Sequence, residues 1–280
     1  MTVDFLFDSL VSLFPSWENT DPFLVISMLI PLVATFGFIT VYALVVIYAE
    51  LKVSSFIQDK VGPMGQGVGL HAGKWGLLQP IADALKLLSK EDIIPSSANK
   101  LLFILAPFMI FVGAFISFIA LPFNEAIIVS DLNIGIFYIL GVGSLAVIAL
   151  ILAGWSSNNK WSLYGGMRSA AQIISYEIPA GLSLIVVIML AGSLNMKEII
   201  IYHKGGISNW IIFDNPFMPI AFVVYFISAL AETNRTPFDL PESESELVAG
   251  FVTEYSGMRY AFFFLSEYAN MFVVSVVAVT

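Results

Sequence analysis

The chain has 280 residues, of which 58% are hydrophobic and only 12% carry a charge, with a net charge of −9. Soluble domains carry roughly 25% charged residues, so this composition excludes a soluble globular protein and predicts a polytopic membrane protein. Cysteine is absent, and the two histidines, His71 and His203, lie outside the apolar stretches. The chain alone therefore offers no disulfide, no thiolate ligand for zinc or an iron–sulfur cluster, and little basis for a haem-binding cytochrome. Any redox centre is expected to be a molecule that binds transiently or to lie in a partner protein.

Membrane-spanning helices need about 20 mostly apolar residues each. A short apolar stretch near the start, Phe5–Trp17, is flanked by acidic residues and is expected to lie on the membrane surface. The six stretches that fit a spanning helix predict an all-α bundle, although the fifth is short: Phe23–Ala49, Leu101–Leu121, Ile134–Gly154, Ser169–Ala191, Pro216–Ala231 and about Met258–Val279.

Most of the lysines and arginines lie in connections on one side of the membrane, if the six stretches cross it in alternating directions. Ten of the twelve fall in the connections between spans one and two, three and four, and five and six, and only Lys197 and Lys204 fall on the other side. Positively charged loops remain in the cytoplasm. The pattern therefore predicts a single integral membrane domain over residues 1–280, with the N-terminus on the outer side of the membrane.

The first cytoplasmic connection, residues 50–100, contains a predicted amphipathic helix over residues 77–90. Leucines and Ile81 recur there at helical spacing, while Gln79, Asp83 and lysines face the other way. Such a helix lies in the membrane interface or packs on a soluble partner, and the two are compatible. The glycine-rich stretch before it, VGPMGQGVGLHAGKWG, lacks the lysine of a phosphate-binding loop and is weak evidence for a nucleotide site.

The last cytoplasmic connection, residues 231–257, is dense in carboxylates. It opens with AETNRTPFDLPESESEL, in which Arg235 is the only cation. Pro237 and Pro241 prevent a continuous helix. Irregular backbone between two apolar helices is tolerated where it is buried in protein or lines a water-filled cavity, so a functional cavity is favoured over an ordinary solvated loop. The acidic residues are Glu232, Asp239, Glu242, Glu244, Glu246 and Glu254.

Two further carboxylates lie inside predicted spans. Glu177 follows the interfacial Arg168 by nine residues, which places it about 13 Å along the helix. A charge near the bilayer centre costs roughly 2.5–3.5 kcal/mol, so a proton-relay or ion-pair role is favoured for Glu177. Glu267 repeats the pattern eight residues after Arg259. Glu50, at the inner end of the first span, fits an interfacial charge equally well.

Three segments together resemble one family. They are residues 231–271, AETNRTPFDLPESESELVAGFVTEYSGMRYAFFFLSEYANM; residues 154–181, GWSSNNKWSLYGGMRSAAQIISYEIPAG; and QDKVGP followed by GLLQPIADALKLLSKEDIIP within residues 58–95. They are similar to the H subunit of respiratory complex I, the proton-translocating NADH:quinone oxidoreductase. Related anchor subunits of ferredoxin-linked, hydrogenase-type ion pumps share parts of the pattern and remain the alternative. A stand-alone transporter is disfavoured because the halves of the chain show no inverted repeat.

The resemblance implies specific roles, with no catalytic residue and no metal ligand in this chain. The acidic connection, residues 231–257, would line a quinone chamber built with peripheral subunits, and quinone would be the substrate. FMN and iron–sulfur clusters would belong to partner subunits, and this chain would bind no cofactor alone. The chamber residues would be Arg235, Phe238, Asp239, Glu242, Glu244 and Glu246, and the proton-coupling residues Glu50, Glu177, Glu232, Glu267, Lys160 and Arg168.

The sequence departs from the family pattern at three places. Leu51 follows Glu50 where the family carries arginine, so an arginine contact at position 51 is lost or supplied elsewhere. Met64–Gly67 replaces the usual Asn-Arg-Val-Gly, which alters the loop near the expected chamber entrance. The family has eight spans and continues past the position of Thr280, so we expect the sequence to be truncated there.

Overall fold

The computed structural model describes residues 21–63, 74–124, 127–202, 205–206, 209–241 and 243–280. The predicted surface stretch Phe5–Trp17 and the chamber residue Glu242 lie outside these ranges. Within them the chain is mostly helical, with one small antiparallel hairpin in which β1 (Pro122–Asn124) pairs with β2 (Ile127–Ile128). The prediction of an all-α membrane bundle is confirmed.

Five of the described helical segments are long and apolar enough to cross a membrane. The sixth predicted span is the 15-residue helix α10 (Met218–Glu232), which is apolar but shorter. The five are α2 (Asp21–Ile57), α4 (Lys100–Ser117), α5 (Gly135–Gly143) continued by α6 (Leu145–Ser156), α7 (Lys160–Ala191) and α12 (Gly257–Val279).

Short elements connect these helices. The amphipathic helix predicted over residues 77–90 is α3, which spans Gln79–Ser89. Leucines of its apolar stripe, including Leu85 and Leu88, are exposed on the outer side of the chain. The other short elements are η2 (Lys74–Gly76), α8 (Met196–Tyr202), α9 (Ile211–Asp214), α11 (Glu244–Leu247) and η4 (Gly250–Val252).

Helix α7 differs from the predicted span Ser169–Ala191 because it begins at Lys160. The side chain of Asn159 accepts a hydrogen bond from the backbone N–H of Trp161 at 2.9 Å, which caps the helix there. Gly192, with φ of 70°, ends it in the left-handed conformation. With 32 residues the helix is about 48 Å long, longer than the ~30 Å hydrocarbon core, so it must tilt or extend beyond the membrane.

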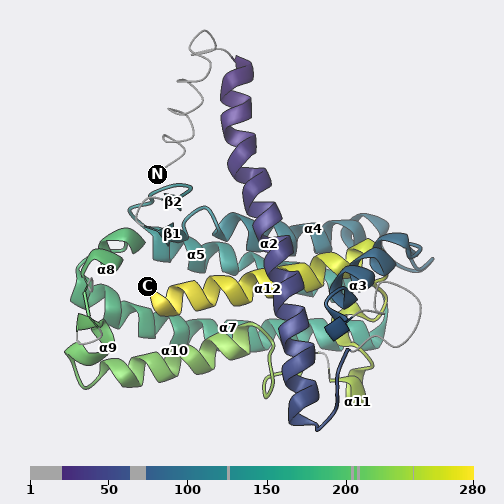
Figure 1. Ribbon diagram of the computed structural model, residues 1–280. Coiled ribbons are helices and arrows are strands. Elements are labelled where there is room, and N and C mark those ends of the chain that lie inside the picture. The colour runs from purple at the N-terminus through teal and green to yellow at the C-terminus, as the bar shows by residue number, and fades with distance from the viewer. Residues whose placement is uncertain (1–20, 64–73, 125–126, 203–204, 207–208, 242) are drawn as a thin grey trace.

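The third predicted span, Ile134–Gly154, is not one continuous helix. Helix α5 ends at Gly143 and α6 begins at Leu145, with Ser144 between them. Helix α2 also differs, since it continues to Ile57, beyond the predicted end at Ala49. It contacts α12 and α3, and crosses the other spans instead of running alongside them (Figure 1).

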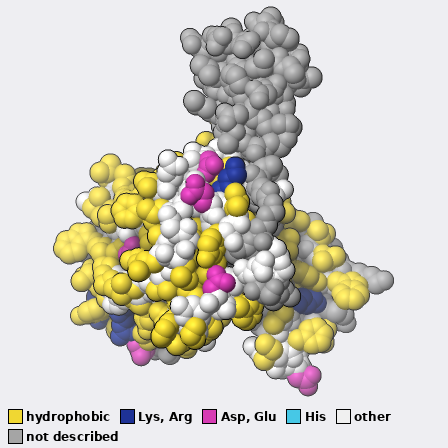
Figure 2. Space-filling model, turned by 90° about the vertical axis from the view of Figure 1, so that its left-hand side faces the viewer, with side chains coloured by type: hydrophobic (Ala, Val, Ile, Leu, Met, Phe, Trp, Pro, Cys, Tyr) yellow, Lys and Arg dark blue, Asp and Glu magenta, His cyan; other side chains and the backbone are white. Residues whose placement is uncertain are grey.

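The remaining helices form the body of the bundle. Helix α7 packs against α6 on one side and α10 on another, and α4 packs against both α6 and α12. The surface is largely hydrophobic, and on the α8–α9 side only a few charged side chains interrupt it (Figure 2). An apolar surface of this extent is typical of a protein surrounded by lipid and partner helices.

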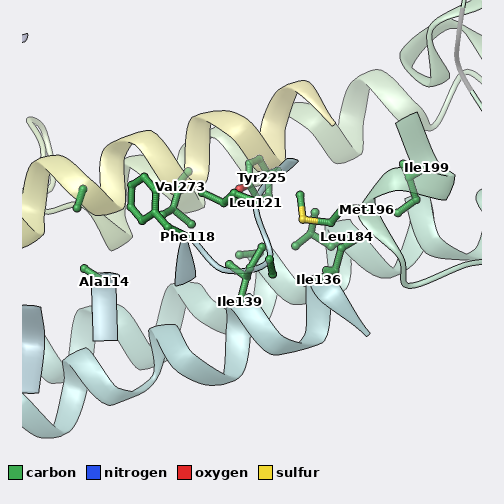
Figure 3. Close-up of a cluster of buried hydrophobic side chains, with 14 of the residues drawn as sticks. Ala114, Phe118, Leu121, Ile136, Ile139, Leu184, Met196, Ile199, Tyr225 and Val273 are labelled. Atoms are coloured by element: carbon green, nitrogen blue, oxygen red, sulfur yellow. The ribbon is translucent and has the colours of Figure 1, made fainter. Parts of the chain in front are cut away.

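Two hydrophobic clusters hold the bundle together. The first lies between α5, α7, α10 and α12 and includes Phe118, Met196 and Tyr225 (Figure 3). The second includes Phe103 and Tyr255, whose rings stack with centroids 4.1 Å apart. These clusters occupy different parts of the bundle, and the polar residues described below lie between and beside them.

Glycines allow three backbones to approach closely. A Cβ on Gly166 would lie 2.8 Å from the carbonyl oxygen of Leu150 and 3.3 Å from the Cα of Gly154, so α6 and α7 touch there. A Cβ on Gly165 would lie 2.6 Å from the Cα of Gly250 in η4. Small residues permit such contacts between membrane helices. The acidic connection is thereby held directly against α7.

Candidate functional site

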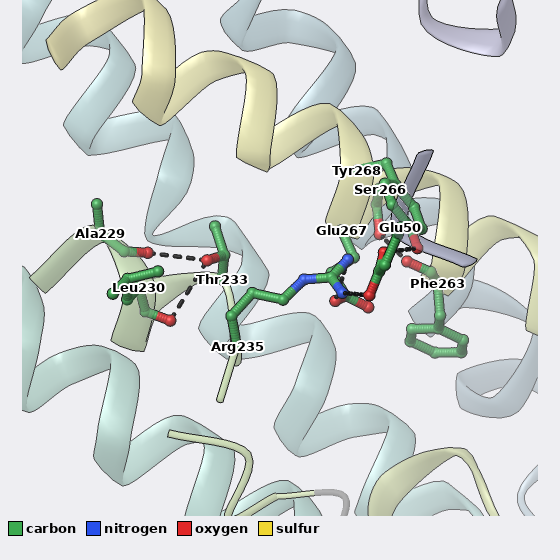
Figure 4. A network of polar contacts seen from close by, with 9 residues as sticks. All are labelled: Glu50, Ala229, Leu230, Thr233, Arg235, Phe263, Ser266, Glu267 and Tyr268. Atoms are coloured by element: carbon green, nitrogen blue, oxygen red, sulfur yellow. Dashed lines mark hydrogen bonds and ion pairs between the residues drawn. The ribbon is translucent and has the colours of Figure 1, made fainter. Parts of the chain in front are cut away.

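Arg235 joins the acidic connection to two spans. Its Nη1 lies 2.7 Å from Oε1 of Glu50 on α2, and its Nη2 lies 3.2 Å from Oε1 of Glu267 on α12 (Figure 4). The hydroxyl of Tyr268 donates a hydrogen bond of 2.8 Å to Oε2 of Glu50. The guanidinium carbon of Arg235 also lies 4.9 Å from the centre of the Tyr268 ring. We call Glu50, Arg235, Glu267 and Tyr268 the Arg235 cluster.

The Arg235 cluster is held partly out of water. The side chains of Arg235 and Glu267 are each 23% exposed, and Nε of Arg235 is buried without a partner among the described residues. Burial alone would lower the pKa of Arg235, but Glu267, Tyr268 and Glu50 together raise it above its ordinary value. Arg235 therefore remains a cation, and any change of charge in the cluster must come from its carboxylates.

A tight turn after α10 directs Arg235 toward α12. The hydroxyl of Thr233 donates to the carbonyl of Ala229 at 2.9 Å, and Asn234 adopts a positive φ of 50° (Figure 4). The backbone N–H of Arg235 then donates a hydrogen bond of 3.1 Å to the carbonyl of Leu230. Asparagine tolerates this left-handed conformation better than most residues. The sequence Thr-Asn-Arg thus ends the helix and points the guanidinium away from it.

One face of α7 fixes the rest of the acidic connection. Arg168, Gln172 and Tyr176 recur at intervals of four residues, so they lie along one side of the helix. Nη1 of Arg168 pairs with Oε2 of Glu246 at 2.6 Å. The Tyr176 ring packs edge-on against Phe238, with centroids 5.1 Å apart.

Gln172 is the buried member of this row. Its Nε2 lies within hydrogen-bond distance of the carbonyl oxygens of Ala231 and Phe238, both at 2.8 Å, and of Oδ1 of Asn234 at 3.1 Å. It was not among the predicted site residues. A polar residue four positions from Arg168 and from Tyr176 on an otherwise apolar helix is the signal that identifies it.

Glu177 and Glu232 form a second group of carboxylates. Glu177 on α7 accepts a hydrogen bond from the hydroxyl of Ser144, at the interruption between α5 and α6. Glu232 ends α10 and is close enough to Glu177 for their charges to interact. Glu232, Gly143 and Asn270 line two small cavities, of about 40 Å³ and 30 Å³. A water molecule needs roughly 10–15 Å³ of such space, so each cavity has room for water.

The other predicted site residues are placed less centrally. Asp239 and Glu246 are exposed on the outer side of the single chain, and the carbonyl of Asp239 accepts from Ser243 at 3.2 Å. Glu244 begins the short helix α11. Nζ of Lys160 lies 4.8 Å from the ring centre of Trp161, and no described carboxylate forms an ion pair with it. The structure therefore brings Arg235 together with Glu50 and Glu267, and leaves Lys160 apart.

The chemistry available at these positions is proton binding. Carboxylates in partly hydrated protein take up or release protons when a nearby charge changes. A fixed cation at Arg235 touches two carboxylates, and a third, Glu232, lines two cavities with room for water. Across the described part of the chain, no group of three Asp, Glu or His side chains is arranged to hold a metal ion.

Comparison with known proteins gives consistent matches. Residues 30–280, which include the whole Arg235 cluster, match the NADH dehydrogenase family. The chain is 53% identical over 257 residues to the H subunit of the NADH-quinone oxidoreductase of Chlorobaculum tepidum, covering 91% of this chain and 69% of that protein. It is 48% identical over 270 residues to the H subunit from a Geobacillus species, covering 96% and 76%. The H subunit from Dehalococcoides mccartyi is 50% identical over 258 residues, covering 91% and 69%.

Proposed function

We propose that this chain couples quinone reduction to proton translocation. The premise is that the chain belongs to the NADH dehydrogenase family and, within it, to the H subunits of complex I. As a membrane subunit of an oxidoreductase complex it works together with other complex I subunits. Electrons would reach quinone through FMN and iron–sulfur clusters in those partners. This chain would supply one wall of the quinone chamber and part of the proton route.

The observation that carries this proposal is the contact of Arg235 with Glu50 and Glu267. Quinone takes up two electrons and two protons on reduction, so the charge beside the chamber changes during each turnover. The acidic connection would carry the exposed Asp239 and Glu246 toward that chamber, and Arg235 joins the same connection to two spans. A change of charge at the connection therefore has a direct mechanical and electrostatic path into the membrane.

The proton route would continue from the Arg235 cluster to the second group of carboxylates. Glu267 and Glu232 both line the cavity of about 40 Å³, and Glu232 interacts electrostatically with Glu177. Protons would pass between these acids through water in the cavities. Arg168, paired with Glu246, would hold α11 in place, and Lys160 would remain a peripheral member of the route.

The exposed surfaces support the placement of partners. Asp239 and Glu246 are open on the single chain, as expected of residues that a peripheral subunit covers. The outward leucines of α3 would lie in the cytoplasmic interface of a bacterial inner membrane, beside the chamber entrance. The distribution of lysine and arginine supports an orientation in which the N-terminus would lie on the periplasmic side.

Neutral substitutions in assembled complex test the proposal. We expect Glu177→Gln and Asp239→Asn each to reduce NADH-driven proton pumping in inverted membrane vesicles, by roughly a hundredfold or more if a proton-transfer group is lost. Glu198→Gln is the control, because Glu198 lies on α8, at the end of the bundle away from α11 (Figure 1). Normal pumping by both variants, with the complex fully assembled, would remove these carboxylates from the mechanism.

A further inference from the structure

The interruption of the third span occurs beside a carboxylate. Between α5 and α6, the backbone N–H of Ser144 still donates to the carbonyl of Leu140 at 3.2 Å. Its hydroxyl has two acceptors within reach, the same Leu140 carbonyl at 3.2 Å and Oε1 of Glu177. One hydroxyl thus touches a fixed backbone acceptor and a side chain that can change its charge.

A serine hydroxyl can satisfy both protonation states of Glu177. It carries one hydrogen to donate and two lone pairs that accept. When Glu177 is ionised, the hydroxyl donates to the carboxylate, which is a charge-assisted hydrogen bond. When a hydronium ion in the cavity gives a proton to the carboxylate, one O–H bond of hydronium breaks, water remains, and the new carboxyl O–H donates to Oγ of Ser144. The serine hydrogen then turns to the carbonyl of Leu140, and no proton leaves the serine.

The preceding residue, Gly143, lies beside the other carboxylate. A Cβ placed on Gly143 would be 3.6 Å from Oε1 of Glu232. Gly143, Glu232 and Asn270 line both small cavities. Gly143 therefore lies against Glu232 and Ser144 against Glu177, so two consecutive residues at one interruption contact the two carboxylates.

We propose that Ser144 is a positioning residue for Glu177, which holds the carboxyl group in one place through its protonation and deprotonation. The inference rests on the proposed function, because it assigns a role within the same proton route. Gly143, with no side chain, keeps the cavity beside Glu232 open. The interruption between α5 and α6 would thus serve the route as well as the packing of the bundle.

The test uses whole complex I carrying Ser144→Ala. Infrared difference spectra report the carboxyl stretching band that disappears in Glu177→Gln, and proton pumping per NADH is measured on the same preparations. We expect Ser144→Ala to shift that band toward a free carboxyl and to lower pumping several-fold. Ser144→Thr, which keeps the hydroxyl, should restore both.

Ser183→Ala is the matched control, because Ser183 is a buried serine of α7 whose hydroxyl donates to a backbone carbonyl, that of Ala180 at 2.6 Å, and which lines neither of the two small cavities. It should leave the band and the pumping unchanged. A Ser144→Ala complex with an unshifted band would overturn the inference. If that variant fails to assemble, Ser144→Cys provides the same test with a weaker donor, and an unshifted band there would also overturn it. Normal pumping in Glu177→Gln would instead count against the proposed function itself.

Discussion

Guanidinium groups can pair with two carboxylates at once because their N–H groups form a planar fork. Arg235 uses two of its nitrogens in this way, one toward Glu50 and one toward Glu267. Leu51 stands where the family carries an arginine next to this glutamate, and Glu50 instead has Arg235 and the hydroxyl of Tyr268 as partners. Glu50 thus has a cationic partner from a distant part of the chain, although residue 51 is a leucine.

Gln172 allows a prediction about how the acidic connection is held. In Gln172→Leu the carbonyls of Ala231 and Phe238 lose their side-chain donor, and a buried acceptor left unsatisfied costs about 1–3 kcal/mol. We expect this loss to displace the acidic connection, which under the proposed function lines the quinone chamber, and so to raise the KM for quinone. Steady-state NADH:quinone kinetics measure this. Asn195→Leu, which removes a buried amide that donates to Asp131 at 2.7 Å, is the control, and an equal rise in both variants would contradict the assignment.

Tyr255 gives a prediction about alkaline pH. Burial raises the pKa of its hydroxyl to about 12, above the ordinary value near 10. Below pH 10 both folded and unfolded tyrosine are protonated, so the residue does not change stability with pH there. Between pH 10 and 12 the unfolded residue releases its proton more readily, and stability is lost as pH rises. Tyr255→Phe should flatten this part of the profile of thermal inactivation against pH, and an unchanged profile would show that the hydroxyl is not responsible.

At the scale of the element, packing between α6 and α7 depends on Gly166. Alanine there would bring a methyl group to 2.8 Å from the carbonyl oxygen of Leu150, which is closer than packed atoms approach. We expect Gly166→Ala to force the helices apart, with a loss of about 1–3 kcal/mol typical of overpacking, and to lower the thermal inactivation temperature of the complex.

Gly181 supplies the matched control on the same helix. A Cβ there meets no atom within 4 Å, and alanine in a helix is favoured over glycine by roughly 0.5–1 kcal/mol. Gly181→Ala should therefore leave the inactivation temperature unchanged or raise it slightly. Comparable losses in both variants would mean that helix propensity or a partner protein, and not the contact with α6, sets the effect.

Most of the helices could be predicted from the sequence, because apolar stretches of sufficient length have few alternatives in a membrane. The boundaries were less predictable. Helix α7 starts at Lys160 because Asn159 caps it, although polar residues such as Lys160 and Arg168 had suggested a loop. The interruption at Ser144 could not be predicted, because the sequence has no proline there and the apolar pattern continues across it without change.

At the scale of the whole molecule, the residue types of the site were predictable and their pairing was not. A charged carboxylate is energetically unfavourable in the membrane, so each carboxylate inside an apolar stretch can be identified individually from the sequence. The contact between Glu50 and Arg235 joins residues 185 positions apart, and no local pattern in a single sequence specifies which cation reaches which acid. The same holds for Gln172, whose role depends on three acceptors in a distant loop.

Under the proposed function, polar groups act in series through an apolar bundle. The series would begin at the exposed Asp239 and Glu246, pass the Arg235 cluster, and reach the cavities beside Glu232 and Asn270. Hydrophobic clusters border it, so an altered charge at one end is screened less than it would be in water. The central claim is that a change of charge at the acidic connection is transmitted along these groups to the carboxylates in the membrane.

The most direct test of that claim is the number of protons pumped per NADH oxidised by assembled complex carrying Arg235→Gln in proteoliposomes. The neutral side chain cannot pair with Glu50 and Glu267, so the acidic connection loses its ion pairs with α2 and α12. We predict that electron transfer to quinone continues at a reduced rate while the protons pumped per NADH fall well below those of the unmodified complex. An unchanged ratio, at whatever rate of electron transfer, would contradict the account.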